Sequence, residues 1–338
     1  VPVLVDERKG DEGNPWGVRF MRMFDMANDS HLFRTATDLR DAGAEMDGNR
    51  WVDTDGTVWL PLYEAKMIHQ YDHRWTTYDD EGGSAREVTE VEKADPQFEP
   101  MPRYWVPESR VASRLEAKDW SQKWLMGWRD ICRTTDKRSV VVSAIPRVAA
   151  NHKTPLFDTY KNNEWNAILF ANLLSLPLDY FARQKIGGTS LTYFFLKQFP
   201  IFPPGQYSKK DIDFVTTRVA ELTYTSRSMR EFAHDLGYFG SPFKFDPVRR
   251  HSLKSEIDAY FGYLYGLTRD ELRYILDPKD VMGEDYPSET FRVLKNNEMK
   301  EYGEYRTQRL VLEAWDRFWA EGTFTDREGI ENVLEAAS

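Results

Sequence analysis

Cysteine is almost absent from this sequence: Cys132 is the only one among 338 residues. One thiol cannot form an internal disulfide, and no second thiol exists to build a structural zinc site. Long apolar runs are also missing, because no window approaches the roughly 18 uncharged apolar residues of a membrane-spanning helix. The first residues, VPVLVDERKG, lack the basic start and apolar middle of a signal peptide. These absences predict a cytoplasmic protein without a membrane segment.

Recognisable catalytic signatures are missing as well. The sequence has no glycine-rich loop after a strand, no P-loop and no G-x-S-x-G elbow. GNPWG (13–17) matches the N-P-P-[YF] loop of adenine-N6 methyltransferases only in part, since Trp16 replaces the second proline. We therefore assign no catalytic residue, no metal and no cofactor to this chain. Because VPVLV is typical of a strand, we expect the chain to be part of a longer protein.

Charge is distributed unevenly along the sequence. The net charge of −10 argues against a polyanionic partner. Residues 101–205, however, carry 15 lysines and arginines against 8 aspartates and glutamates, a surplus of 7 positive charges. A basic surface indicates nucleic-acid binding only if it lies on one face of the molecule. The alternative is that surface charge is patchy by chance.

The hydrophobic content of 41% is sufficient for one large core or two ordinary ones, and the residue patterns predict an α+β fold. Residues 51–60 favour a β-hairpin with a turn at Asp53–Gly56, and RSVVVSAIPR favours a buried strand ended by Pro146. We expect a helix over 107–128, with Trp120 and Trp124 on its apolar face, and a polar mobile loop over 77–99.

Helical periodicity dominates the later part of the chain. Residues 165–186 are apolar with helical spacing, and Pro177 should kink or split that helix. Further helices are expected from residue 208, over 249–266, over 268–276 with a Thr268–Glu271 capping box, and over 288–320. After Pro203 and Pro204 the residue pattern becomes predominantly helical. This change predicts a target-recognition domain over 1–205 and a helical region over 206–338.

Two groups of polar residues could bind a metal. His69 and His73 are four residues apart and would share one face of a helix. The other uses of these histidines are a hydrogen bond to a phosphate or base edge, or simple packing. Glu64 and Lys66 have the E-x-K spacing of many restriction nucleases, with Asp53 or Asp55 upstream, so a two-metal nuclease is an alternative function.

The stretch QKIGGTSLTYFFLKQFPIFPP (184–204) combines a glycine pair with positive charge and hydroxyls. Such a loop could hold a phosphate, and the alternative is a tight turn between helix and strand. Arginine and lysine can read guanine, and asparagine can read adenine, in the major groove. The candidate DNA contacts are Lys66, His69, His73, Arg74, Arg129, Arg133, Lys137, Arg138, Arg147, Asn151, Lys153, Arg183, Lys185, Gly187, Gly188 and Thr189.

Several long blocks resemble a known family. PLYEAKMIHQYDHRW, RDICRTTDKRSVVVSAIP, LLSLPLDYFARQKIGGTSLTYFFLKQFPIFPP and FRVLKNNEMKEYGEYRTQRLVLEAW are similar to the carboxy-terminal half of fused adenine-specific DNA methyltransferases of the Type IIG restriction–modification kind and of related phage-defence systems. The likeness runs from NPWGVRFMRMFDMANDSHLF to LEAW. The glycine pair, aromatic run and P-x-P-P also resemble the end of a target-recognition domain in Type I specificity subunits.

The resemblance implies a division of labour within a longer protein. S-adenosylmethionine and the N-P-P-[YF] loop would belong to an upstream methyltransferase domain, and this chain would bind double-stranded DNA for it. The remaining alternatives are the nuclease described above and a protein-interaction module that docks defence-system subunits.

Overall fold

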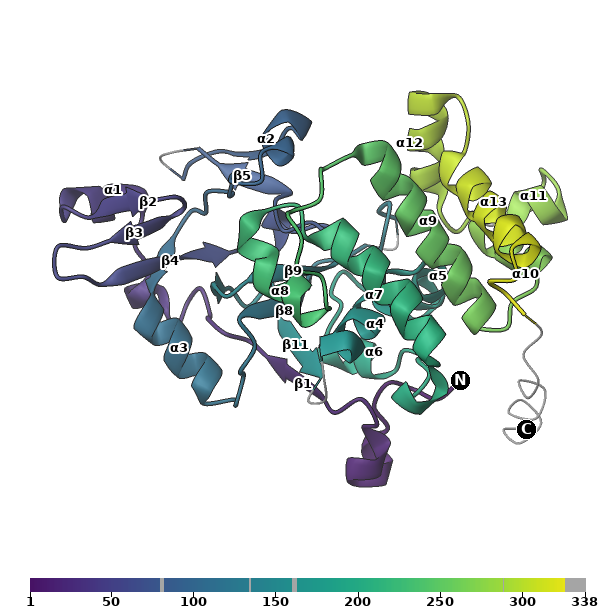
Figure 1. The fold of residues 1–338 in the computed structure, drawn as a ribbon, viewed down its shortest axis with the longest axis horizontal. Helices are drawn as coiled ribbons and strands as arrows, with labels where there is room; N and C mark the ends of the chain where they lie inside the picture. Colours follow the sequence, from purple (N-terminus) through teal and green to yellow (C-terminus); the bar gives the residue numbers. More distant parts are fainter. Residues whose placement is uncertain (80–81, 134, 160–162, 288, 326–338) are drawn as a thin grey trace.

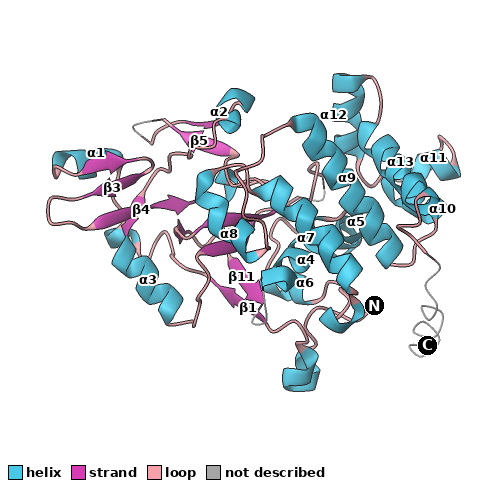
Figure 2. Ribbon diagram, in the orientation of Figure 1, coloured by secondary structure: helices cyan, strands magenta, loops and turns pink. Residues whose placement is uncertain are grey.

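The computed structural model describes residues 1–79, 82–133, 135–159, 163–287 and 289–325. Mostly antiparallel sheets occupy the first half of the chain, and helices dominate the second half (Figures 1 and 2). The predicted α+β fold is confirmed.

A four-stranded antiparallel sheet lies at the centre, in the order β1 (Val18–Met21), β11 (Leu156–Thr159), β8 (Trp124–Trp128) and β9 (Val142–Pro146). The predicted strand ending at Pro146 is confirmed as β9. Gly127 in β8 is required by packing, because an added Cβ would lie 3.1 Å from side-chain carbons of Leu156 and Thr154. Close approach of this kind is the usual reason for glycine inside a strand.

A second sheet forms the lobe at the left of Figure 1. Its strands are β2 (Glu45–Asp47), β3 (Arg50–Val52), β4 (Val58–Tyr63), β7 (Trp105–Pro107) and β10 (Ala149–Ala150). β3 and β4 pair in antiparallel fashion, which confirms the predicted hairpin. Two helices, α1 (Ala36–Asp41) and α3 (Glu108–Glu116), belong to the same lobe.

Two predictions in this part of the chain are wrong. The expected helix over 107–128 ends with α3 at Glu116, because Trp124 begins β8 and pairs with Pro146. The expected loop over 77–99 contains β5 (Thr76–Tyr78), β6 (Ala85–Glu87) and α2 (Glu90–Ala94) in its described part; residues 80 and 81 lie outside it. The strands pair with each other and a Thr89–Glu92 capping box starts the helix.

The helical part begins before residue 205. α4 (Asn163–Leu174) and α5 (Leu176–Lys185) are separated at Ser175, which caps α5, and Pro177 occupies the first turn of α5 as predicted. The helices that follow are α6 (Tyr193–Lys197), α7 (Lys209–Thr223), α8 (Arg230–Asp235), α9 (Pro247–Leu264), α10 (Arg269–Leu276) and α11 (Pro278–Met282).

The last helical segment is divided. Instead of one helix over 288–320, there are α12 (Arg292–Tyr302) and α13 (Arg306–Ala320), and residue 288 lies outside the described residues. Gly303 ends α12 with a left-handed backbone, φ +74°, which glycine adopts without strain. The Thr268–Glu271 capping box predicted for α10 is present.

The hydrophobic interior continues across residue 205. The largest cluster of buried side chains contains Trp128 from β8, Phe170 from α4, Val215 from α7, Tyr260 from α9 and Trp315 from α13. Polar contacts also cross this point, since the Trp124 indole N–H donates to Asp235 at 2.7 Å. The mixed and helical regions therefore pack as one unit around a shared core.

A buried polar cluster joins residues 73–99 to the start of α8. His73 is hydrogen-bonded to the Ser226 hydroxyl at 2.9 Å, and its other ring nitrogen lies 3.9 Å from Glu99. Burial lowers the pKa of His73 to about 3, so the ring is neutral at physiological pH. Burial raises the pKa of Glu99 to about 7, against the lowering effect of hydrogen bonds from Ser228 and Ser226 and of nearby Arg74.

We expect the Glu99→Gln variant to have a different pH dependence of stability. The folded pKa of Glu99 lies above its unfolded value, so protonation favours the folded state between pH 7 and about 4.5. Lowering the pH from 8 to 5 should increase the unfolding free energy of the parent relative to the variant by about 2 kcal/mol. Urea unfolding at the two pH values measures the difference, and a pH-independent difference would contradict it.

Candidate functional site

Two basic segments, residues 129–139 and 183–191, lie side by side. The backbone N–H of Cys132 donates to the Thr189 carbonyl at 3.0 Å, and that of Leu191 donates to the Asp130 carbonyl at 2.7 Å. Ile131 also forms an isolated antiparallel bridge with Ser190. The structure thus brings the diglycine loop next to the basic stretch that follows β8.

The carboxylate of Asp179, in α5, bonds to residues of both basic segments. This fully buried carboxylate accepts from Arg138 Nε at 2.7 Å and from the Ser139 backbone N–H at 3.1 Å. It also pairs with Arg183 Nε at 3.5 Å, and the Arg183 guanidinium donates to the Lys137 carbonyl at 3.1 Å. Arg138 and Arg183 are therefore internal supports of the surface and offer little of their charge to a ligand.

Three cations of the two segments are exposed: Arg133, Lys137 and Lys185. In the described part of the chain, none of their side chains forms a hydrogen bond or an ion pair. We call these three residues the basic surface. Exposed lysine and arginine side chains that lack internal partners are the groups that can neutralise phosphates.

The glycine pair has a different role from the expected one. Gly187 and Gly188 are exposed, neither has a positive φ, and no described atom would lie within 4 Å of an added Cβ. The loop is therefore neither a tight left-handed turn nor a close approach to another part of the chain. Open space beside the loop leaves its backbone accessible to an external surface.

Several predicted DNA contacts lie in the interior. Arg74 is fully buried and its guanidinium donates to backbone carbonyls, His73 is 2% exposed, and Asn151 is 4% exposed with its side-chain oxygen accepting from the Lys153 backbone N–H at 3.0 Å. These three residues have no surface for a duplex in this conformation. The correction follows from long-range packing, because Arg74 and His73 bond to residues 225 and 226.

Other predicted contacts are engaged elsewhere on the surface. The Arg147 guanidinium donates to the Gln122 carbonyl at 2.9 Å, and Lys153 forms a 2.7 Å ion pair with buried Asp130. Arg129 Nε donates to the Ile68 carbonyl at 2.8 Å, which ties the loop containing His69 to β8. Lys66 is exposed, with its ammonium 4.4 Å from the centroid of the Tyr78 ring.

The residues of the nuclease alternative do not form one site. Asp53 and Asp55 lie in the turn before β4, whereas Glu64 and Lys66 follow the end of that strand. At about 3.3 Å per residue, the six residues of β4 separate these groups by roughly 20 Å. Glu64 instead accepts from the Tyr78 hydroxyl at 2.8 Å, and no cluster of three metal-ligating side chains occurs among the described residues.

The two histidines do not share a helical face. His69 and Asp72 form a β-bridge on either side of a turn, in which Tyr71 has a positive φ of 58°. His69 packs on the Trp75 ring with centroids 4.3 Å apart, while His73 points into the interior. The spacing of four therefore does not create a metal site here.

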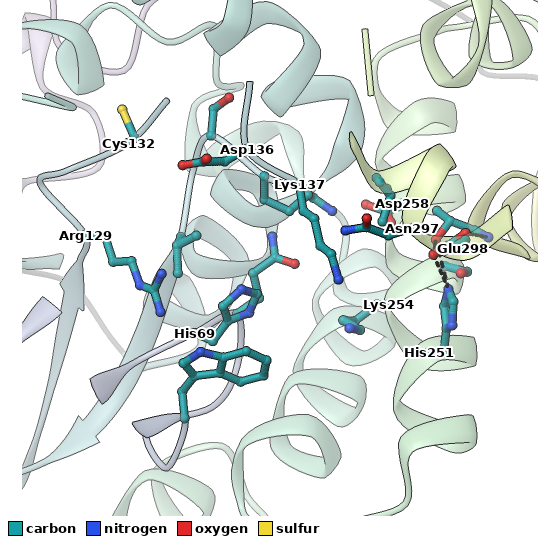
Figure 3. Close-up of a pocket in the computed structure, with 18 of the residues that line it drawn as sticks. His69, Arg129, Cys132, Asp136, Lys137, His251, Lys254, Asp258, Asn297 and Glu298 are labelled. Atoms are coloured by element: carbon teal, nitrogen blue, oxygen red, sulfur yellow. Dashed lines mark hydrogen bonds and ion pairs between the residues drawn. The ribbon is translucent and has the colours of Figure 1, made fainter. Parts of the chain in front are cut away.

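A pocket of about 580 Å³ opens between the sheet region and the helices, and we call it the junction pocket. His69, Arg129 and Lys137 line one side, and His251, Lys254 and Asn297 line the other (Figure 3); Gln70 also lines the pocket. The second group comes from α9 and α12. The basic surface thus adjoins a cavity whose other wall belongs to the helical region.

Lys254 is the most unusual charge in the junction pocket. Burial lowers the pKa of its ammonium to about 8, with further lowering by Arg250 and Arg138 that outweighs the effect of Asp258. Asp258, one turn further along α9, accepts from the Leu176 backbone N–H at 2.7 Å, and burial raises its pKa to about 6. The Lys254 ammonium therefore lies in a partly buried site with two arginines and two carboxylates, Asp258 and Glu298, near it.

Two other polar side chains of the pocket wall, His251 and Glu298, already have hydrogen-bond partners within the protein. His251 Nε2 is hydrogen-bonded to the Thr307 hydroxyl at 2.9 Å, and burial lowers the pKa of His251 to about 4. Glu298 accepts from the Thr307 backbone N–H at 2.7 Å, and burial raises its pKa. Lys254, in contrast, forms no hydrogen bond or ion pair within the described part of the chain, which leaves its ammonium available to a ligand.

Sequence reasoning missed Lys254 and Asn297. Both lie on predicted helices far from the basic segment, and neither belongs to a motif. The weak signal is that His251, Lys254 and Asp258 place polar side chains on one face of a helix that is otherwise well buried.

No protein-family model matches this chain, and no curated protein is similar to it. Within the ranges that the structure describes, no helix has both the length and the apolar character needed to cross a bilayer.

Proposed function

We propose that this chain is the DNA-sequence recognition module of an adenine-N6 DNA methyltransferase in a restriction–modification or phage-defence system. The module holds double-stranded DNA for an upstream methyltransferase domain, which binds S-adenosylmethionine. The observation that carries the proposal is the adjacency of the diglycine loop and the basic segment, with Arg133 and Lys137 in that segment and Lys185 at the end of α5, just before the diglycine loop.

This arrangement suits contact with a phosphate backbone. None of the three cations forms an ion pair among the described residues, so DNA binding would not first have to break one. The exposed backbone at Gly187 and Gly188, together with the exposed Thr189, adds neutral groups next to the charges. Contacts of this kind fix the position of a protein on a duplex, while a few side chains read base edges.

The contact set is smaller than the sequence alone indicated. His73, Arg74 and Asn151 are buried, and Arg138, Arg147, Lys153 and Arg183 bond internally. Arg129 also bonds internally, to the Ile68 carbonyl, so the remaining set consists of the basic surface, residues 187–189, Lys66 and His69.

The Arg133→Ala/Lys137→Ala/Lys185→Ala variant should bind duplex DNA at least about tenfold more weakly than the parent in low salt. Each lost phosphate contact should also reduce the slope of log affinity against log salt by about 0.9, giving a total change of roughly 2 to 3. Fluorescence anisotropy with a labelled duplex, measured across a salt series, gives both quantities.

The matched control removes three exposed cations from the opposite lobe: Arg40→Ala/Arg50→Ala/Arg110→Ala. Affinity should change little in this variant, although its net charge falls by the same amount. Equal losses in both variants would contradict a localised interface. A parent chain that binds no duplex in low salt but captures defence-system subunits would favour the protein-interaction alternative.

A further inference from the structure

Two lysines in the junction pocket point toward each other. Lys137 extends into the cavity from the sheet side, and Lys254 extends from α9 on the opposite side (Figure 3). Over the described ranges, neither ammonium donates a hydrogen bond or forms an ion pair. Two converging like charges in a partly enclosed space are unfavourable unless an anion lies between them.

Asp258 and Glu298 act electrostatically on Lys254, and Glu298 also on Lys137, but in the described part of the chain neither carboxylate forms an ion pair with these lysines. Asp258 is bonded to the start of α5 and Glu298 to Thr307. Glu87, Asp136 and Glu301 also line the pocket, but they are exposed to solvent, where water screens their charge. The pKa of Lys254 is lowered mainly by burial and then by Arg250 and Arg138, although Asp258 and Glu298 act in the opposite direction.

The size and remaining chemistry of the pocket indicate more than a bare anion. A volume of about 580 Å³ lies within the range of roughly 300–1,000 Å³ that small-molecule sites occupy. Asn297 supplies an amide that both donates and accepts, Gln70 supplies a second amide whose nitrogen also lies 3.5 Å from the Val140 carbonyl, and Trp75 and Tyr302 supply aromatic surface. Amides and aromatic rings are the groups that bind the polar edge and flat face of a nucleobase.

We propose that the junction pocket binds a nucleotide, with the phosphoryl group between Lys137 and Lys254 and the base toward Gln70 and Asn297. The nucleotide is either free or the phosphorylated end of a DNA strand, and the two sources share the same phosphomonoester chemistry. A bound phosphoryl group would add negative charge directly between the two ammonium groups and favour the protonated form of Lys254. For a free nucleotide, the inference does not depend on the duplex-binding function proposed above.

The test uses the Lys254→Met variant, with Lys300→Met as its control. Lys300 is an exposed lysine of α12 that does not line the pocket. Titration calorimetry with each of the four deoxynucleoside 5′-monophosphates should detect binding to the parent and to Lys300→Met. Lys254→Met should bind at least about tenfold more weakly, because a charge-assisted contact to the phosphate is lost.

Folding is checked by thermal unfolding of the same proteins. Lys254→Met should melt at or above the temperature of the parent, since methionine removes a partly buried charge without an internal partner. The corresponding deoxynucleosides, which lack phosphate, should bind weakly or not at all. Absence of binding for all four nucleotides, or equal affinity in the parent and in folded Lys254→Met, would overturn the proposal.

A competition experiment distinguishes the two sources and separates this site from the basic surface. A 5′-phosphorylated duplex that displaces the nucleotide better than its unphosphorylated form identifies a strand end, and no difference identifies the free nucleotide. The Arg133→Ala/Lys185→Ala variant should lose duplex affinity while nucleotide binding is unchanged. Failure of duplex binding therefore leaves the pocket intact as a hypothesis, and failure of nucleotide binding leaves the duplex proposal intact.

Discussion

Arg74→Met is expected to lower the free energy of unfolding by about 3–5 kcal/mol. The Arg74 side chain is fully buried, and its guanidinium donates to the carbonyls of Lys93 and Asp95 at 2.8 Å each, with further bonds to Phe98 and Thr225. Methionine fills a similar volume but leaves these buried carbonyls without a donor. Urea denaturation followed by circular dichroism measures the loss.

The control for this prediction is Arg86→Met. Arg86 forms an ion pair with Glu92, but its side chain is 57% exposed. Exposed pairs contribute about 0–1 kcal/mol, so this variant should remain close to the parent. A similar small loss in both variants would show that the carbonyls around Arg74 are satisfied in another way.

Asp179→Ala is expected to destabilise the chain by about 3–5 kcal/mol and to weaken duplex binding at the same time. Removal of this fully buried carboxylate leaves Arg138 and Arg183 with uncompensated charge. It also removes the acceptor of the Ser139 backbone N–H, which positions the basic segment. Denaturation gives the stability, and anisotropy under folding conditions gives the affinity.

Asp213→Ala serves as the comparison for Asp179→Ala. Asp213 pairs with Lys209 within one helix, and both side chains are more than half exposed. Its loss should change stability by less than about 1 kcal/mol and leave duplex binding unchanged. If Asp179→Ala is destabilised but binds duplex as tightly as the parent, then Asp179 supports the fold without positioning the basic surface.

The elements that sequence patterns predicted well are those whose signals are local. The hairpin of β3 and β4 has turn residues between apolar runs, and the α10 capping box requires only Thr268 and Glu271. Pro177 likewise fixes the start of α5 by its own geometry. Each of these features is determined by residues only a few positions apart, so the local sequence was sufficient to predict it.

The errors arise where distant contacts decide the structure. Trp124 has helical spacing relative to its neighbours, but pairing of β8 with β9 makes it part of a strand. Arg74 and His73 look like surface residues in MIHQYDHRW, and only contacts with residues about 150 positions away place them inside. The same limit applies to the junction pocket, whose two lysines are separated by more than a hundred residues.

The shared core also determines how the chain can be modified. One apolar interior contains Trp128, Phe170, Val215, Tyr260 and Trp315. Dividing the chain near residue 205 would therefore expose a large hydrophobic surface on both fragments and favour their aggregation. In a chimera whose residues 1–205 come from another protein, the core side chains of the two parts would not pack against each other. Substitutions confined to exposed side chains such as Arg133, Lys137 and Lys185 leave this shared interior unchanged.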